Sequence, residues 1–381
     1  MRRSVSILAV LLAGFAFAAP ARADTAIGKV ARPTPVSGSD GHLLWSEYDA
    51  AARLYYLVQR FQGNIARLPV KPRSVPFDVD VGQDAGGQPV AAYSRCRREP
   101  PGRDPRTGNA LTQMPQWSRG RGCDVYMLNL QTNVEIRVRG ASSSHGSEFL
   151  PTVWRSRMAF ARVYERRHGM AGDRTYLYFR SLTRGGTSHQ IPAGNRARDR
   201  YCSGKPRRCR LLVEPGPTTL DLVSRDFVFG WDSTHGGPSS DVYREKLSTE
   251  GTQRRLVARA GSGDIQAIEL LGPQIEPGGR IVWIRSMFGD STRSDVERYN
   301  LLNGARSVGQ LQPVAGQPFI DTVVAHGLDL STSVYLASGL FPVGEPCTPQ
   351  TPCLTTPGCS DVQPCELRAA TSLAFAAFRE R

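Results

Sequence analysis

The side chains of this 381-residue chain that could perform chemistry are scattered. No Gly-x-Ser-x-Gly nucleophile elbow and no phosphate- or dinucleotide-binding glycine loop is present. The serines beside His145 fit a polar connector better than a catalytic triad, and the spacing of the histidines matches no metal site. We therefore predict no catalytic residue, no metal ligand and no cofactor. The histidines are His42, His145, His168, His189, His235 and His326.

One short segment, Asp78-Val-Asp-Val-Gly-Gln-Asp84, alternates acidic and other residues. Calcium loops use alternating oxygen ligands, but no further acidic ligand follows at the spacing that such loops require. In a strand, Asp78 and Asp80 would share one face while their apolar neighbours occupy the other. We therefore predict that Asp78 and Asp80 face a central channel or a neighbouring sheet, and that Asp84 caps a turn.

The eight cysteines are even in number and lie in loop-like segments beside Gly, Pro and Arg. In an exported protein this pattern indicates disulfides, whereas a zinc site would need closely spaced cysteine or histidine pairs. Cys96 and Cys123 end one strand and begin the next, so antiparallel pairing would place them opposite each other. Cys202 and Cys209 bracket a short basic segment. We predict disulfides between Cys96 and Cys123 and between Cys202 and Cys209.

The last four cysteines, Cys347, Cys353, Cys359 and Cys365, are evenly spaced among Pro and Thr and allow three pairings. By analogy with the hairpin that ends at Cys96, Cys347 and Cys365 would lie at the base of a loop. This favours a nested arrangement, in which Cys347–Cys365 encloses Cys353–Cys359. The sequential arrangement, in which each cysteine bonds its neighbour along the chain, remains open.

Two of these cysteine loops are rich in arginine and carry an aromatic residue, Trp117 in the first and Tyr201 beside the second. Such loops could bind a polyanion, for example nucleic acid, an acidic glycan or a charged cell-wall polymer. The alternative is a pair of solvated loops, in a chain in which lysine is nearly absent and arginine supplies most of the positive charge. The candidate anion-binding residues are Arg97, Arg98, Arg119, Arg121, Arg198, Arg200, Arg207 and Arg208.

The N-terminal segment has the features of a targeting signal. Two arginines precede an apolar run from Val5 to Ala19, and small residues precede Asp24. The run is too short to cross a bilayer, so we predict a signal peptide over residues 1–23 and a single domain over residues 24–381. The net charge of +14 falls to +11 once this leader is removed. We expect a secreted or envelope-associated protein without a transmembrane segment after cleavage.

The elements that would position these residues recur six times along the chain. Each unit has a short run rich in β-branched and aromatic residues, such as Phe227-Val-Phe-Gly-Trp, and then a run that often opens on Asp-Val, as in Ser240-Asp-Val-Tyr. Four short strands per unit predict an all-β fold, a six-bladed β-propeller of four-stranded antiparallel blades. We expect the segment from Ala369 to Phe378 to close the ring. The blades are expected to start near Ile27, Val75, Glu148, Pro217, Asp264 and Phe319.

The third unit resembles the repeat of TolB-type propellers. It contains Glu148-Phe-Leu-Pro-Thr-Val-Trp, Met158-Ala-Phe-Ala-Arg and Tyr176-Leu-Tyr-Phe-Arg-Ser-Leu. The Ser-Pro-Asp-Gly turn of that family is approached only at Glu276-Pro-Gly-Gly and Ser39-Asp-Gly. The resemblance covers the blades and includes no counterpart of the N-terminal domain of TolB. It therefore implies a TolB-like propeller fold and carries no function with it.

Two functions are compatible with these observations. The first is a non-catalytic binding module, a monomer of the envelope or exterior that binds a protein or an anionic polymer. The second is a propeller enzyme, a hydrolase or lyase that acts on a glycan or lactone-like substrate at the channel mouth. A pocket with two convergent carboxylates would favour the enzyme, and a flat basic face would favour the binding module. The absence of a catalytic motif favours the binding module.

Overall fold

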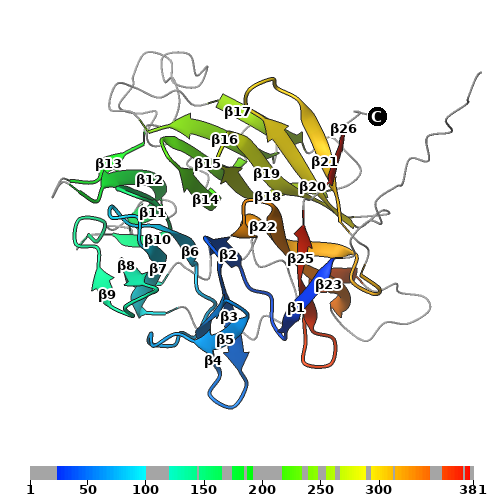
Figure 1. Ribbon diagram of the computed structural model, residues 1–381, viewed down its shortest axis with the longest axis horizontal. Helices are drawn as coiled ribbons and strands as arrows, with labels where there is room; N and C mark the ends of the chain where they lie inside the picture. The colour runs from blue at the N-terminus through cyan, green and yellow to red at the C-terminus, as the bar shows by residue number, and fades with distance from the viewer. Residues whose placement is uncertain are drawn as a thin grey trace, which may run out of the picture.

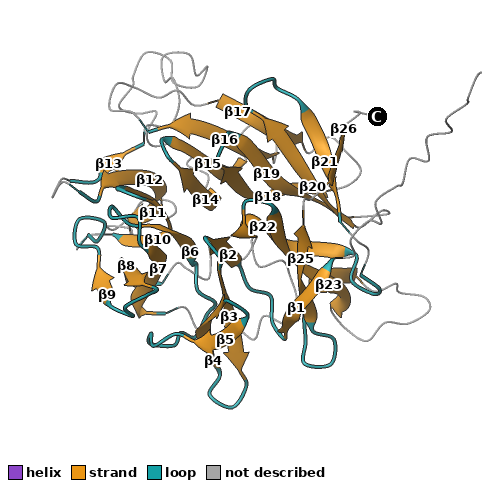
Figure 2. Ribbon diagram, in the orientation of Figure 1, coloured by secondary structure: helices purple, strands orange, loops and turns teal. Residues whose placement is uncertain are grey.

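The described part of the chain folds into six antiparallel sheets arranged around a central axis (Figure 1). All of its regular secondary structure consists of β-strands, so this part of the chain contains no helix that could cross a membrane (Figure 2). The chain is an all-β, six-bladed propeller, which confirms the predicted fold class. The computed structural model describes residues 24–99, 120–143, 146–164, 174–183, 187–191, 217–233, 239–247, 255–261, 267–288, 293–311, 314–343, 354–371 and 374–377.

The blades follow one another along the chain, and the first strand of each blade lies nearest the axis (Figure 1). Blade 1 contains β2 (Val36–Ser39), β3 (His42–Asp49), β4 (Leu54–Phe61) and β5 (Asn64–Arg67). Blade 2 contains β6 (Asp80–Gln83), β7 (Pro89–Arg98), β8 (Arg121–Asn129) and β9 (Glu135–Arg137). Blade 3 contains β10 (Ser147–Trp154), β11 (Arg157–Tyr164), β12 (Arg174–Ser181) and β13 (His189–Gln190).

The second half of the ring has the same plan with two additional strands. Blade 4 contains β14 (Pro217–Val223), β15 (Asp226–Ser233), β16 (Ser239–Lys246) and β17 (Arg255–Gly261). Blade 5 contains β18 (Ala267–Glu276), β19 (Arg280–Phe288), β20 (Arg293–Asn300), β21 (Arg306–Gln310) and the added β26 (Ala374–Ala377). Blade 6 contains β22 (Phe319–Asp329), β23 (Thr332–Val343), β25 (Cys365–Thr371) and β1 (Thr25–Val30), with β24 (Leu354–Gly358) paired to β23.

The second strand of each blade is apolar on both faces because a blade packs against two neighbours. In β15, Phe227 and Phe229 pack into the cluster shared with blade 3, whereas Val228 packs into the cluster shared with blade 5. All three side chains are fully buried. The described residues form six such clusters, one between each pair of neighbouring blades. The consecutive apolar residues of the sequence therefore build the ring.

The repeated Asp-Val pair of the third strands also has a structural explanation. In blade 4, Val242 is fully buried between blades, while the preceding Asp241 accepts hydrogen bonds from Arg259 of β17 at 2.8 and 2.9 Å. In blade 2, Asp124 accepts a hydrogen bond from Arg137 of β9 at 2.8 Å. In these two blades the valine thus packs in the core between blades, and the aspartate binds the outer strand of its own blade.

The ring closes through the N-terminal strand. β1 pairs antiparallel with β25, with Val30 opposite Cys365, as the adjacent blue and red strands of Figure 1 show. Asp24, just before β1, is held as well: its Oδ2 accepts a hydrogen bond from the Tyr335 hydroxyl at 2.7 Å, and its carbonyl oxygen accepts one from Arg368 at 2.7 Å. The start of the described chain therefore supplies the outer strand of the last blade.

This closure differs from the one expected for residues 369–378. The first of these residues belong to β25, the third strand of blade 6, and β26 pairs with β21 at the outer edge of blade 5. The open edge of β25 is filled by β1 instead, and blades 1 and 6 also meet very closely at the axis. An added Cβ on Gly38 of β2 would lie 2.6 Å from the carbonyl oxygen of Gly327 of β22, so only glycine fits at this seam.

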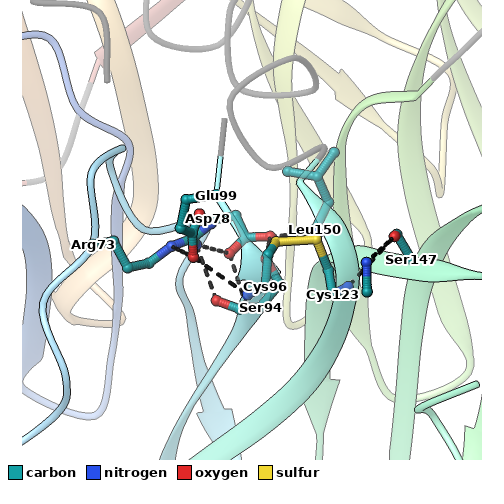
Figure 3. Close-up of a disulfide and its surroundings, with 9 residues drawn as sticks. Arg73, Asp78, Ser94, Cys96, Glu99, Cys123, Ser147 and Leu150 are labelled. Atoms are coloured by element: carbon teal, nitrogen blue, oxygen red, sulfur yellow. Dashed lines mark hydrogen bonds and ion pairs between the residues drawn. A yellow bond between two sulfur atoms is a disulfide. The ribbon is translucent and has the colours of Figure 1, made fainter. Parts of the chain in front are cut away.

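The disulfide between Cys96 and Cys123 predicted from the sequence is present (Figure 3). The two residues are register partners on β7 and β8, so the bond crosses one antiparallel ladder. Cys202 and Cys209 lie outside the described residues, and their predicted bond remains a prediction.

In the C-terminal part of the chain, Cys359 bonds Cys365. The nested pairing, Cys347–Cys365 and Cys353–Cys359, is therefore wrong, whereas the sequential alternative includes the observed bond. The physical reason is a tight turn between β24 and β25, in which the Gln363 carbonyl oxygen accepts a hydrogen bond from the Ser360 amide at 2.9 Å. This turn returns the chain within a few residues, and both bonded cysteines are fully buried between blades 1 and 6.

Beside the first disulfide, a buried ionic network joins blades 1, 2 and 3 (Figure 3). Arg73 donates to the carboxylates of Asp78 and Glu99 at 3.3 and 2.9 Å, and its backbone pairs with Tyr55 of blade 1. Asp78 also accepts a hydrogen bond from the amide of Leu150 on blade 3 at 2.7 Å. Asp78 thus faces a neighbouring sheet, as predicted. Because each charge has partners, the network is accommodated without an isolated buried ion.

We predict that deleting residues 24–30 costs on the order of 5 kcal/mol of unfolding free energy, because it exposes the apolar edge of blade 6 that Val30 covers. Deleting residues 374–381 is the matched control, since blade 5 keeps four strands without β26. Chemical denaturation of both proteins measures the difference. An equal loss of stability in the two deletions would contradict the role assigned to β1.

Candidate functional site

The first strands of the blades surround a cavity on the propeller axis, with a volume of about 410 Å³. Residues from all six blades line it, including turns between first and second strands, such as Asp40-Gly41 and Asp329-Leu330. The cavity therefore opens on the face of the propeller that carries these turns. We call it the axial pocket, and its lining includes Ser37, Asp80, Trp154, Asp221, Gln274 and His326.

Two aspartates of the axial pocket are held rigidly by groups on strands. Asp80 of blade 2 accepts hydrogen bonds from the Ser37 hydroxyl at 3.1 Å and from the amide of Val153 on blade 3 at 2.9 Å. Asp221 of blade 4 accepts one from the amide of Ile275 on blade 5 at 2.7 Å. Each carboxyl thus reaches from its own blade to the next one, and Asp80 takes both roles predicted for it, facing the channel and a neighbouring sheet.

The two carboxyls influence each other's protonation. Burial, and next the negative charge of Asp80, raise the pKa of Asp221 to about 8. Burial also raises the pKa of Asp80. The hydroxyl of Thr152, on the blade between them, opposes the rise in pKa of each carboxyl. The pair therefore behaves as one coupled system, which retains a proton at neutral pH on Asp221.

His326 of β22 adds a neutral imidazole to the axial pocket. Burial, and next the charge of Arg280, lower the pKa of His326 to about 4, so the ring is uncharged at neutral pH. Both ring nitrogens are buried, and neither has a hydrogen-bond partner among the described residues. A neutral imidazole has one donor and one acceptor, so this side chain can still bind a polar group that enters the pocket.

The charge of the axial pocket is opposite to that of the whole chain. Four aspartates line the cavity, and its lining among the described residues contains no lysine or arginine. At the rim, hydrogen bonds from the Ser331 hydroxyl and amide lower the pKa of Asp329, so this carboxylate is ionised at neutral pH. A pocket of this kind attracts cationic or neutral polar molecules and repels anions.

The structure separates the candidate anion-binding arginines from this pocket. Arg97, Arg98 and Arg121 are exposed where the β7–β8 hairpin passes into the loop closed by the disulfide. β7 starts at the turn beside the pocket face and runs away from it, so these arginines lie on the opposite face of the propeller. The other candidates, Arg119, Arg198, Arg200, Arg207 and Arg208, lie outside the described residues.

Asp221 and His326 are site residues that were not predicted from the sequence. One signal was available for Asp221: it stands between apolar residues of a first strand, as Asp80 does. Strand alternation turns such a residue to the sheet face opposite its apolar neighbours, and in the first strand this face is next to the axis. His326 carries no comparable signal. No group of three or more His, Cys, Asp or Glu side chains within the described ranges is arranged to hold a metal ion.

Comparisons with known proteins identify no family for the chain: no protein-family model and no curated protein matches it. Among solved structures, it is similar to the acylaminoacyl peptidase of Pyrococcus horikoshii, with 9% identity and a TM-score of 0.43, over 92% of this chain and 52% of that one. The chain thus spans about half of the peptidase.

Two further solved structures resemble the chain over most of their own length. The α-L-arabinanase of Penicillium chrysogenum has 8% identity and a TM-score of 0.45, over 92% of this chain and 98% of that one. The β-propeller domain of the Trilobed protease of Pyrococcus furiosus has 8% identity and a TM-score of 0.38, over 88% and 97%. At such identities the likeness concerns the fold alone.

We predict that the protein loses about 2 kcal/mol of stability through Asp221 between pH 6.5 and 8.5. In this range the native carboxyl binds a proton that the unfolded chain, with an ordinary aspartate pKa, does not, so stability falls as pH rises through its pKa of about 8. Asp221→Asn should flatten the dependence measured by chemical denaturation. Glu148, whose pKa burial raises to about 7, contributes equally in both proteins.

The surface variant Glu47→Gln is the control for this measurement, since Glu47 is an exposed partner of Arg67. It should leave the slope unchanged. A slope that is the same in Asp221→Asn and in the wild type would show that Asp221 does not carry the proton.

Proposed function

We propose that this protein is an exported β-propeller whose axial pocket binds a small hydroxyl-rich ligand, such as the end of a glycan. The observation that carries the proposal is the convergence of Asp80, Asp221 and His326 in one cavity, to whose lining the described part of the chain contributes no lysine or arginine. Its volume of about 410 Å³ falls within the range of roughly 300–1,000 Å³ typical of small-molecule sites. The TolB-like repeat supports the propeller fold in this proposal, and it gives no information about the ligand.

The side chains of the axial pocket suit sugar hydroxyls. Carboxyl oxygens accept hydrogen bonds, and the Gln274 amide and the neutral His326 ring each offer a donor and an acceptor. Trp154, half-buried at the wall, offers an apolar ring on which the C–H face of a sugar can pack. An acidic glycan would meet four aspartates, so the proposed ligand is uncharged at this point.

Export of the protein rests on the N-terminal segment and on the disulfides. The leader predicted over residues 1–23 lies outside the described residues. The two disulfides, Cys96–Cys123 and Cys359–Cys365, are compatible with an oxidising compartment. A glycan of the cell envelope or of the surroundings would be accessible to a protein located there.

We expect at least one of four neutral disaccharides, cellobiose, xylobiose, arabinobiose or diacetylchitobiose, to give saturation-transfer NMR signals with the oxidised protein, whereas digalacturonate gives none. Trp154→Ala should weaken binding about 10-fold or more, because it removes the apolar wall of the pocket. Leu302→Ala, which shortens a side chain that is 87% exposed outside the pocket, is the control and should bind normally. Absence of binding by all four sugars would overturn the proposal.

The face of the propeller opposite the axial pocket carries exposed arginines, which favour a second function. Arg97, Arg98 and Arg121 are exposed together beside a disulfide, which holds the hairpin in one conformation. Such a group can bind a polyanion by releasing counterions from it. This is the binding module for an anionic polymer that the basic loops predict, and it is independent of the axial pocket because the two sites lie on different faces.

We expect Arg97→Ala/Arg98→Ala to weaken binding of heparin oligosaccharides and to reduce the slope of log K against log salt concentration by up to about 2. The control is Arg155→Ala/Arg225→Ala, which removes the same charge from turns on the pocket face. Titrations at several salt concentrations measure both. If the two double variants bind equally, net charge alone explains the affinity and the arginines of blade 2 form no site.

A further inference from the structure

We infer that Asp221 and Asp80 form a general acid–base pair that hydrolyses a glycosidic bond in the axial pocket. This inference rests on the proposed function, because it requires a glycan bound there. Its basis is geometric: two carboxyls from different blades, Asp80 of blade 2 and Asp221 of blade 4, line one cavity. Both groups are fixed by hydrogen bonds from strands, which gives the rigid placement that catalysis needs.

The pair differs from the other buried carboxyls of this protein, several of which are paired with an arginine. Glu148 accepts a hydrogen bond from Arg162 at 2.7 Å, and Asp241 binds Arg259 at 2.8 Å. Asp80 and Asp221 are hydrogen-bonded instead to a hydroxyl and to backbone amides. Without a cationic partner, a buried carboxyl keeps a proton that it can donate.

The surroundings of the two carboxyls favour different roles for them. Asp221 retains its proton, since burial and the charge of Asp80 raise its pKa to about 8. Burial raises the pKa of Asp80 as well, but the hydrogen bonds that it accepts from the Ser37 hydroxyl and the Val153 amide oppose this rise and favour its ionised form. One carboxylic acid and one carboxylate in a single site is the arrangement from which acid and base roles are assigned.

An acetal is the bond that such a pair can cleave without further groups. Its carbon–oxygen bond breaks when the leaving oxygen is protonated and when a carboxylate stabilises the positive charge that develops at carbon. Hydrolysis of an ester or amide would need donors for a developing oxyanion. The backbone amides of Val153 and Ile275, which lie beside the pair, already donate to its carboxyl oxygens.

The reaction consumes one water. Asp221 donates its proton to the glycosidic oxygen while the bond from this oxygen to the anomeric carbon breaks, and the bonding electrons remain on the oxygen. Asp80 removes a proton from the water, whose oxygen bonds to the anomeric carbon. The products are a reducing sugar and an alcohol. Asp221 is left ionised and Asp80 protonated, and transfer of one proton through solvent restores the pair.

The test uses the full-length oxidised protein and whichever of the four disaccharides binds, with release of reducing sugar followed by NMR. We expect turnover by the wild type and a loss of about 10²-fold or more in Asp221→Asn and in Asp80→Asn, with binding retained. Glu47→Gln should turn over normally. Sugar that binds without being cleaved by the wild type would overturn this inference and leave the proposed function standing.

The pH dependence of wild-type activity tests the same inference even if the asparagine variants fail to fold. Activity should fall above about pH 8 while binding persists, because Asp221 then loses the proton that it must donate. The other titratable groups lining the pocket are His326, Asp40 and Asp329, and neither His326 nor Asp329 titrates in this range. Activity that is constant from pH 7 to 9.5 would exclude Asp221 as the acid.

Discussion

The structure depends on hydrogen bonds that run from the first strand of one blade to a side-chain oxygen of the preceding blade. The amide of Val81 donates to the Ser37 hydroxyl at 2.9 Å, that of Val153 to Asp80 at 2.9 Å, and that of Ile275 to Asp221 at 2.7 Å. Near the axis the blades lie too close for large side chains, so short polar residues satisfy these amides. Leaving such a buried amide unpaired would cost about 1–3 kcal/mol.

This constraint also creates the axial pocket. Asp80 and Asp221 accept strand amides of the next blade without an arginine beside them among the described residues, whereas Asp78, which accepts the amide of Leu150, also binds Arg73. The same fixation that stabilises the ring therefore places Asp80 and Asp221 in one cavity, desolvated and without a cation. The raised pKa of Asp221 follows from this placement. Fold and site are thus two consequences of one set of contacts.

The sequence predicts the fold better than the site because short patterns that recur in each blade indicate its strands. Consecutive apolar residues such as Phe227-Val-Phe indicate a strand buried on both faces, and the repeated Asp-Val pair marks the third strand. Closure by β1 is different, since it joins residues some 340 positions apart and leaves no periodic signal. The Asp80–Asp221 pair likewise forms only when the ring places blades 2 and 4 on either side of blade 3 around one cavity. The spacing of these residues along the chain does not predict that they come together.

Net charge misleads about this protein because its charges are segregated. Many arginines neutralise acids within the structure, as Arg73 does for Asp78 and Glu99. Those that remain exposed near the blade 2 disulfide lie on one face, whereas the carboxyls without arginine partners line a pocket that opens on the other. A chain of net charge +14 can therefore present an acidic cavity to small molecules. The net charge of a propeller is the sum over both of its faces, whereas a ligand interacts with only one face.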